Sequence, residues 1–471
     1  MLNIQIFFYL ILRNKHYIIK KNFMHYISKC EDWVIEQYPE NEEGCNYKLS
    51  DYAIVEPYRD GIMLFHTITW SFFFLTQEEY DNILTNKFFI EKRIVLSDKI
   101  EETPIAEEIY MMRSTRKDFT PYTELSKFVV LTTNECNANC PYCYEWLKKG
   151  KMSIETAEKF ISFVKEKNIH NKTVRIEWFG GEPLKNIDII DYVTKRLKEE
   201  NINYESTMTS NSLLLTKEVV DKAVESWHLK RIQVTIDGPE EMYNKIKNYS
   251  NFEGNAFKQV IENIRYVKEH TDIVIIIRIN ISHENIDYIE ELADYLLSDI
   301  CGGNVSLYFK MEYDTANNVE LLKKDGFEDR YYALLDKYTY DETRFLIQKN
   351  KLMNCMADNC GCVAIAPNGN IHSCEHCRET SKIGNLNDGI IHKDVIDNIL
   401  SKGGINIEFC KKVGCKLMPV CRKFNFCYPE RRCEKEDMFE YENEFFIKKM
   451  KYTTDYYFKK LEERKNEKGE G

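Results

Sequence analysis

The segment Cys136-Asn-Ala-Asn-Cys140-Pro-Tyr-Cys143 gathers three cysteines on what the sequence predicts to be one tight loop. It follows directly on residues 128–132, an apolar run with the length and composition of a buried β-strand. Three thiolates on such a loop can hold three irons of a 4Fe–4S cube and leave the fourth iron open. Structural zinc normally completes its shell with a fourth ligand, and no histidine or further cysteine lies close by in the sequence. The spacing therefore favours an iron–sulfur cluster with one open iron.

Similar strand-like runs recur downstream and alternate with segments of helical period. The expected strands span residues 128–132, 174–178, 205–209, 232–236, 273–279 and 305–310, and the expected helices span 154–167, 188–200, 217–227, 256–270, 284–297 and 328–336. Such a succession of βα units favours a parallel sheet wrapped by helices. The run Ile273-Val-Ile-Ile-Ile277 lacks polar alternation, which is typical of a strand buried on both faces. We therefore expect an α/β fold whose core is a partial (β/α)6 TIM-type barrel.

Glycine-rich and polar segments stand at the ends of several predicted strands. Gly180-Gly181-Glu182-Pro183 ends the second strand, Thr209-Ser210-Asn211 the third, and Thr235-Ile236-Asp237-Gly238-Pro239 the fourth, while Arg278 lies at the end of the fifth. Sites in such barrels gather at this edge, because the carboxyl ends of parallel strands meet there. Glycines let the backbone approach a ligand closely, and Glu182 offers an acceptor for an ammonium group. The alternatives are a plain strand-to-helix turn and, for Arg278, an ordinary surface charge.

Taken together, residues 127–337 resemble the radical S-adenosylmethionine (radical SAM) superfamily. The CxxxCxxC loop, with Tyr142 before its last cysteine, matches the family's cluster-binding loop, and the strand ends match its GGEP, TNG-type and S-hydrophobic-D-G-P segments. The resemblance implies that Cys136, Cys140 and Cys143 bind a 4Fe–4S cluster. It also implies contacts with S-adenosylmethionine (SAM) at Gly180, Gly181, Glu182, Pro183, Ser210, Asn211, Thr235, Asp237 and Arg278. In this family the reduced cluster and SAM yield a 5′-deoxyadenosyl radical, which removes a hydrogen atom from the substrate.

One segment departs from the family pattern. After the fourth strand the family usually has HDxxR, whereas this chain has Tyr243-Asn244-Lys245-Ile246-Lys247. A lysine in place of the arginine cannot make the planar two-bond contact that a guanidinium makes. The sequence therefore predicts a weakened role for this position.

The other large group of cysteines lies further along the chain, where ten of the 16 fall between Cys355 and Cys433. A disulfide scaffold is typical of short secreted chains, so metal binding is the better interpretation. The spacing of Cys355, Gly369 and Cys374 resembles the opening of the SPASM extension, which carries auxiliary iron–sulfur clusters in peptide-modifying radical SAM enzymes. We expect two auxiliary 4Fe–4S clusters, with zinc in one site as the alternative. Their expected ligands are Cys355, Cys374, Cys410, Cys415, Cys421, Cys427 and Cys433.

The spacing alone does not divide these ligands between two clusters. Only the interval from Cys415 to Cys421 agrees with the family's usual spacing in this part of the extension. Two fully ligated cubes use about eight thiolates, so at least two of the ten cysteines are spare. Cys360, Cys362 and Cys377 are the candidates for that role.

Glu375 follows Cys374 directly in the sequence. In sulfatase-maturing relatives an aspartate at the matching place acts as the base that deprotonates the substrate. The resemblance therefore implies a catalytic role for Glu375, because a carboxylate there can take a proton beside a cluster. The alternative is an exposed carboxylate on a hairpin, and His376 is a weaker candidate for the same role.

The rest of the chain suggests the domain boundaries. We expect an N-terminal region at 1–120 with a module that docks a leader peptide, the radical SAM core at 121–345, the SPASM-like domain at 346–440, and a C-terminal helix and tail at 441–471. The module's strands fall near residues 53–55, 62–66 and 70–75. The apolar run at 4–12 is too short to span a bilayer and has no basic stretch before it, so we expect a buried strand or helix there, or a true start at Met24.

Composition limits the choice of partners. The formal charge of -11 argues against general binding to a phosphate backbone, so we expect neither nucleic acid nor membrane as a partner. The resemblance implies a cytoplasmic peptide maturase that installs a thioether or other crosslink, with ferredoxin or flavodoxin as electron donor. The alternative is an anaerobic sulfatase-maturing enzyme, which forms formylglycine from Cys or Ser. From a different class, a zinc-rich binding protein without catalysis also fits the cysteine count.

Overall fold

The computed structural model describes residues 24–42, 44–114, 122–145, 149–312, 318–338, 347, 356–359, 361–394, 396, 405–421, 433 and 436–467. Two predicted metal ligands, Cys355 and Cys427, lie outside the described residues, as does the apolar run at 4–12. None of the described helices is long and apolar enough to cross a membrane.

Six parallel strands form the centre of the molecule. They are β7 (Lys127–Thr133), β8 (Val174–Gly180), β9 (Tyr204–Ser210), β10 (Leu229–Thr235), β11 (Val274–Ile281) and β12 (Val305–Met311). Their order in the sheet follows their order in the chain, with each strand hydrogen bonded to the next. The α/β fold and the parallel sheet that the sequence predicts are therefore confirmed.

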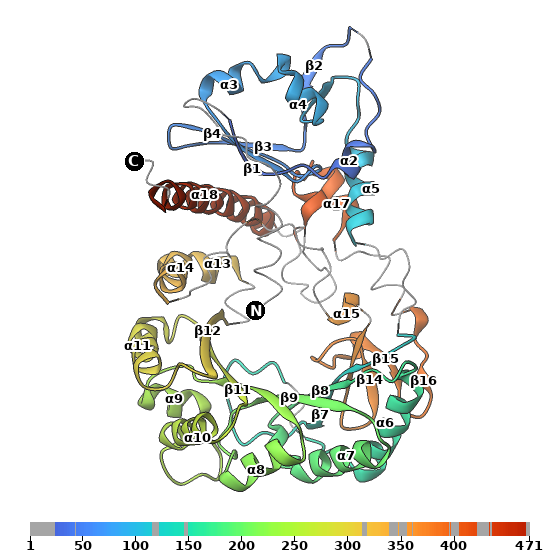
Figure 1. Cartoon of the computed structure of the whole chain (residues 1–471), viewed down its shortest axis with the longest axis vertical. Helices are drawn as coiled ribbons and strands as arrows, with labels where there is room; N and C mark the ends of the chain where they lie inside the picture. Colours follow the sequence, from blue (N-terminus) through green and yellow to red (C-terminus); the bar gives the residue numbers. More distant parts are fainter. Residues whose placement is uncertain are drawn as a thin grey trace.

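Amphipathic helices cover the outer face of this sheet, as Figure 1 shows in its lower half. They are α6 (Ile154–Lys167), α7 (Ile187–Glu199), α8 (Lys217–Glu225), α9 (Glu240–Lys247), α10 (Ala256–His270), α11 (Ile289–Asp299) and α14 (Phe327–Tyr338). Side-chain oxygens of Ser153, Thr216 and Asn255 cap three of them, which satisfies backbone N–H groups that a helix start leaves open. The apolar helix faces and the strands share one core, with Trp178 and Trp227 fully buried in it.

The strand with the longest apolar run differs from its prediction. Ile275, Ile277 and Ile279 of β11 are buried, whereas Val274 on the opposite face is 42% exposed and Ile276 is half-buried. The sequence prediction that this strand is covered on both faces is therefore wrong along part of its length. The physical reason is the open sheet, since helices cover only its outer face.

The sheet does not end at β7 but continues into the C-terminal segment. β13 (Cys362–Ile365) pairs with β7 in parallel, and β14 (Asn370–His372), β15 (Lys382–Asn385) and β16 (Gly389–Ile390) extend the sheet in antiparallel order. The parallel register places Cys362 opposite Lys127 and Ile365 opposite Val130. Short helices α13 (Val319–Lys323), α15 (Met356–Asn359) and α17 (Ile407–Lys412) complete the C-terminal half.

A separate antiparallel sheet stands at the N-terminal end of the chain (Figure 1, top). It has the order β1 (His25–Ser28), β5 (Ser71–Leu75), β4 (Gly61–His66) and β3 (Ala53–Tyr58). The elements around it are α2 (Asp32–Ile35), β2 (Tyr47–Leu49), α3 (Gln77–Asp81), α4 (Lys87–Glu91), β6 (Val95–Ser97) and α5 (Thr103–Ser114), with β2 pairing β6. We call residues 24–114 the N-terminal module.

The last helix, α18 (Glu436–Glu467), lies against the sheet of the N-terminal module. The ring of Phe446 contacts that of Phe65 at 5.1 Å, and the hydroxyl of Tyr58 donates to Asp455 at 2.7 Å. Lys448, which lies between Phe446 and Asp455 in the same helix, pairs with Glu328 of α14 at 2.7 Å. The end of the chain therefore joins its beginning to the core.

Arg113, in the last turn of α5, holds the N-terminal module to the segment around η6 (Met418–Val420). Its guanidinium donates to the carbonyl oxygens of Ile68 at 2.6 Å and Pro419 at 3.0 Å, and pairs with Glu31 at 2.6 Å. It also lies over the ring of Trp70. Because this side chain is only 8% exposed, its contacts are little screened by water.

Replacing Arg113 by methionine should therefore lower the free energy of unfolding by about 3–5 kcal/mol, because Glu31 and the carbonyl groups lose a buried partner. Urea unfolding followed by circular dichroism measures the change. Lys411→Met is the matched control, since Lys411 joins the same two segments through a partly exposed pair with Glu107 and should cost about 1 kcal/mol or less. Equal losses for the two variants would contradict the role of Arg113.

Candidate active site

The cysteine loop leaves the end of β7 and lies on the end of β8. The N–H of Gly181 donates to the carbonyl of Thr133, and the N–H of Glu182 to that of Glu135, both at 2.9 Å. A Cβ atom at Gly181 would lie 2.5 Å from the oxygen of Glu135, and Gly180 has a φ of +116°. Glycine is therefore required here by the contact between two backbone segments, a reason that the sequence did not reveal.

The three thiols of the loop face one another. Burial, with smaller contributions from the carboxylate of Glu182 and the thiols of Cys140 and Cys143, raises the pKa of Cys136 to about 11. The N–H of Ala138 donates to the sulfur of Cys136 at 3.3 Å, which favours its thiolate. Burial also raises the pKa of Cys140, while the ammonium group of Lys247 opposes that rise. A metal that binds here displaces the thiol protons.

The residues present fit a cluster with one open iron. Three thiols from one loop supply the soft ligands that iron–sulfur clusters use. Beside them, Nδ2 of Asn137 is buried without a hydrogen-bond partner among the described residues, so the loop retains a donor for a further group. Its Oδ1 accepts from Asn211 at 2.7 Å, which ties the loop to the end of β9.

Glu182 is fully buried and organises the ends of two strands. Its carboxylate accepts from the hydroxyl of Ser210 and from the N–H of Asn211, both at 2.8 Å, and from the N–H of Leu184 at 3.2 Å. Burial raises its pKa to about 7 despite these donors. The structure thus brings together three of the predicted SAM-contact residues, Glu182, Ser210 and Asn211. Pro183 starts the short helix η2 (Pro183–Asn186) and is buried beside them.

The predicted residues on β10 and β11 also lie side by side. Thr235 and Arg278 are register partners on neighbouring strands, so their side chains share one face of the sheet. Arg278 is half-buried, and its Nε donates to Asn280 at 2.8 Å. Asp237 is fully buried, and its carboxylate accepts from the N–H of Asn280 at 2.9 Å.

Lys247, the lysine in place of the arginine of HDxxR, is a buried cation. Its ammonium group pairs with Asp237 at 2.8 Å and donates to the hydroxyl of Tyr142 at 2.8 Å. Burial lowers the pKa of Lys247, yet the charge of Asp237 together with Tyr142, Cys140 and Tyr243 outweighs this and holds the pKa above its usual value. Asp237 precedes the short helix α9 and Lys247 is its last residue, so this helix sets the spacing of the pair.

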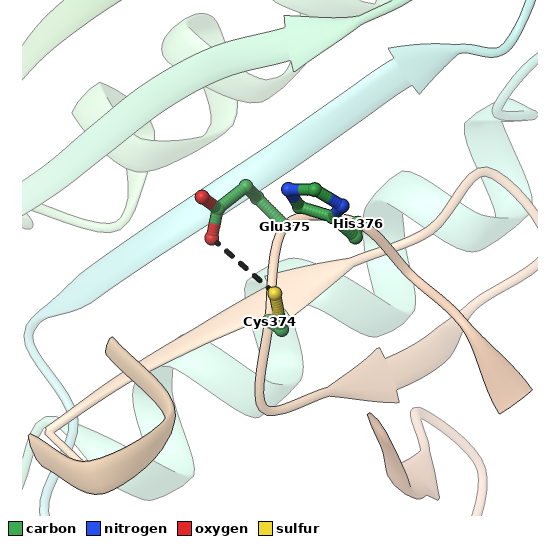
Figure 2. Close-up of side chains that lie close together, drawn as sticks. All are labelled: Cys374, Glu375 and His376. Atoms are coloured by element: carbon green, nitrogen blue, oxygen red, sulfur yellow. Dashed lines mark hydrogen bonds between the residues drawn. The ribbon is translucent and has the colours of Figure 1, made fainter. Parts of the chain in front are cut away.

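The hairpin of the C-terminal segment brings Glu375 to the same region. Figure 2 shows Cys374, Glu375 and His376 on the turn after β14, with the thiol of Cys374 pointing to the Glu375 carboxylate at 3.7 Å. The ring of His376 stacks on that of Tyr144 at 4.2 Å, and Tyr144 directly follows Cys143. The possible metal-ligand atoms of Cys374, Glu375 and His376 lie within 4.8 Å of one another. The second cysteine region therefore contacts the first.

A second group of thiols lies far from that hairpin, against the N-terminal module. Cys410 donates a hydrogen bond to Cys415, which raises the pKa of Cys410, and the thiols of Cys421 and Cys433 raise it further. The same bond lowers the pKa of Cys415, and backbone N–H groups of residues 417 and 418 add to that effect. Four of the predicted metal ligands are thus neighbours, whereas Cys374 lies with the first loop.

Residues 130–296 match the family model of the radical SAM superfamily. The chain therefore contains a radical SAM domain, which supports an enzyme; the radical SAM superfamily uses a 4Fe–4S cluster and SAM. This excludes a zinc-binding protein without catalysis.

The relatives agree with this assignment. The chain is 25% identical over 372 residues to the radical SAM cyclopropyl synthase TigE of Paramaledivibacter caminithermalis, which covers 72% of this chain and 75% of TigE. A solved structure of native anSMEcpe with bound AdoMet has a TM-score of 0.53 at 16% identity, covering 70% of this chain and 99% of that one. The structure of the same protein with AdoMet and the Cp18Cys peptide gives 0.52 over the same shares. These structures share the fold of this chain.

Glu182 predicts a pH dependence of the metal-free protein. Its folded pKa of about 7 lies above its usual value of 4.5, so the folded state keeps this proton where the unfolded chain releases it. The stabilisation is complete below pH 4.5 and is lost as pH rises through about 7, a change of about 3 kcal/mol. Urea unfolding across this range should show the loss in the wild type and its absence in Glu182→Gln. An unchanged slope in that variant would refute the assignment, and Glu155→Gln on the exposed side of α6 is the control.

Proposed function

We propose that this radical SAM enzyme modifies a peptide or protein and installs a crosslink such as a thioether. The observation that carries the proposal is the pairing of β13 with β7, since it places the Cys374–His376 turn beside the cysteine loop. Such an arrangement brings a second cluster site and a carboxylate to the region where the substrate radical forms. TigE is named a cyclopropyl synthase, and anSMEcpe is described with a bound peptide, which supports this class of substrate.

The residues of the first site have separate tasks in this proposal. When bound, the cluster and SAM supply a 5′-deoxyadenosyl radical as the hydrogen-abstracting agent. Cys136, Cys140 and Cys143 hold the cluster, and SAM contacts the strand ends through Gly180, Gly181, Glu182, Pro183, Ser210, Asn211, Thr235, Asp237 and Arg278. The buried hydrogen bonds of Glu182 and Asp237 fix these strand ends before a ligand binds, which lowers the cost of ordering them.

The remaining predicted metal ligands divide into two auxiliary sites. Cys374 belongs to a site beside the first loop, for which Cys355 and Cys427 are the further proposed ligands. Cys410, Cys415, Cys421 and Cys433 form the other site, where four thiols and two backbone N–H donors favour a fully ligated 4Fe–4S cluster. Zinc in this second site is the alternative, because four thiolates also suit it.

Glu375 is the proposed base. It lies on the turn that contacts Tyr144. Its charge also raises the pKa of Glu177 in the middle of β8, so Glu375 faces the open side of the sheet. A carboxylate at this place can accept a proton from the substrate as the new bond forms.

The N-terminal module is the proposed docking site for a leader peptide. Its sheet has two edge strands, β1 and β3, and an extended peptide can add to such an edge through main-chain hydrogen bonds. We further propose ferredoxin or flavodoxin as the electron donor, with the cytoplasm as the compartment.

A second candidate function is the maturation of a sulfatase by oxidation of Cys or Ser to formylglycine. The likeness in fold to anSMEcpe with the Cp18Cys peptide favours it. Trapping with a hydrazide reagent separates the two functions, because only formylglycine carries an aldehyde. Mass alone distinguishes a crosslink, which removes two hydrogens, from formylglycine made from Cys but not from formylglycine made from Ser, which also removes two hydrogens.

Cys140→Ala should abolish reductive cleavage of SAM, since the two thiolates that remain are too few to hold the cluster. The measurement is 5′-deoxyadenosine formed by anaerobically reconstituted protein with dithionite, alongside iron content. Cys301→Ala, a half-buried thiol outside both cysteine regions, is the control and should cleave SAM as the wild type does. Retained cleavage by Cys140→Ala would refute the assignment of the first site.

Glu375→Gln should leave SAM cleavage largely intact and lower product formation by about a hundredfold, because the amide cannot take a proton. Mass spectrometry of the modified peptide measures product. Glu379→Gln is the matched control, since Glu379 lies four residues further along the same hairpin with its side chain 85% exposed. Product at the wild-type level from Glu375→Gln would exclude this residue as the base.

A further inference from the structure

The cysteine loop is bound on its far side by the end of α9, and no sequence motif accounts for this contact. The N–H of Asn139 donates to the carbonyl of Lys247 at 2.8 Å, and its side chain donates to that of Asn248 at 3.1 Å. The N–H of Ser250 donates to the carbonyl of Asn137 at 2.8 Å. Residues between the first two metal-binding cysteines are thus hydrogen bonded to residues 247–250.

The side chain of Lys247 makes further contacts with the cysteine loop. Its ammonium group lies 2.8 Å from both the Asp237 carboxylate and the Tyr142 hydroxyl, and Tyr142 donates to the same carboxylate. The cation also lies over the rings of Tyr142 and Tyr243, at 5.5 and 5.7 Å from their centres. Lys247 and Asp237 are 3% and 0% exposed, so this pair is removed from water.

A buried ion pair of this kind is retained where it fixes a position. Replacing such a pair by apolar side chains is often neutral for stability, so stability alone is a weak reason to keep it. Here the pair links the cysteine loop to two segments about a hundred residues later in the chain, the end of β10 and the end of α9. The loop carries three metal ligands but has no regular secondary structure of its own between Asn134 and Asn139.

We propose that Lys247 is the positioning residue of the cluster loop. Acting through Tyr142 and Asp237, it holds Cys140 and Cys143 in place before metal binds and supplies a fixed positive charge next to Cys140. The proposal rests on the proposed function in one respect, that the loop binds a cluster. Because a buried cation stabilises the more negative, reduced state of a nearby cluster, its loss lowers the reduction potential.

Four variants test this proposal. Hydrogen exchange of the metal-free protein should be about tenfold faster at residues 136–143 in Lys247→Met than in the wild type. After anaerobic reconstitution the variant should retain less iron, and its remaining cluster should have a lower midpoint potential by EPR-monitored titration. Lys247→Arg keeps the charge, so its exchange rate, iron content and midpoint potential should be close to those of the wild type. Lys245→Met, an exposed position on the same helix, is the matched control. If Lys247→Met does not fold, Asp237→Asn/Lys247→Met removes both charges and takes its place in the hydrogen-exchange comparison, where loss of the contact should again speed exchange at residues 136–143.

The outcomes separate this proposal from the proposed function. Wild-type protein that takes up no iron contradicts the proposed function, whereas the exchange rates of the metal-free variants still decide the role of Lys247. Exchange and potential in Lys247→Met equal to those of Lys245→Met overturn the proposal. The proposal is also overturned if Lys247→Met lowers the stability without changing the reduction potential and Lys247→Arg does not restore that stability. Such a result assigns Lys247 a purely structural role.

Discussion

The parallel pairing of β13 with β7 is the contact on which the arrangement of the site depends. β7 is the first strand of the parallel core and leads into the cysteine loop, while β13 begins the hairpin that ends in Cys374 and Glu375. Hydrogen bonding of these two strands occupies the edge of β7 that an open barrel would leave exposed. The same pairing sets the height of the hairpin relative to the loop, so that His376 stacks on Tyr144.

Buried carboxylates, rather than apolar contacts, organise the strand ends. Glu182 accepts from the ends of β9 and η2, and Asp237 accepts from Lys247, Tyr142 and the N–H of Asn280. Each would be costly if unpaired, and each has donors from at least two segments. The outer face of the sheet follows a different principle, since it is closed by apolar helix faces alone. The two faces therefore separate the task of folding from the task of binding.

The sequence predicts the core well because its signals are local. Strand runs, helix periods and the motifs at strand ends are each read within a few residues, and the parallel sheet follows from their alternation. The pairing of β13 with β7 has no such signal, since the partners are more than two hundred residues apart in the chain. The burial of Lys247 and the grouping of Cys410 with Cys433 are also products of tertiary contacts. Ile276 shows how a local signal can also mislead. It belongs to an apolar run but is only half-buried, because the run does not reveal that one face of the sheet is open.

The contact of α18 with the first sheet has a consequence for the order of folding. During synthesis the strands of the N-terminal module leave the ribosome first, but Phe65 and Phe74 receive their aromatic partners, Phe446 and Phe458, only when the end of the chain emerges. Until then the module exposes the apolar face that α18 covers, a feature that makes a nascent chain aggregate. The earliest part of this protein is therefore the last to be completed, and its yield in a cell depends on protection over the whole length of translation.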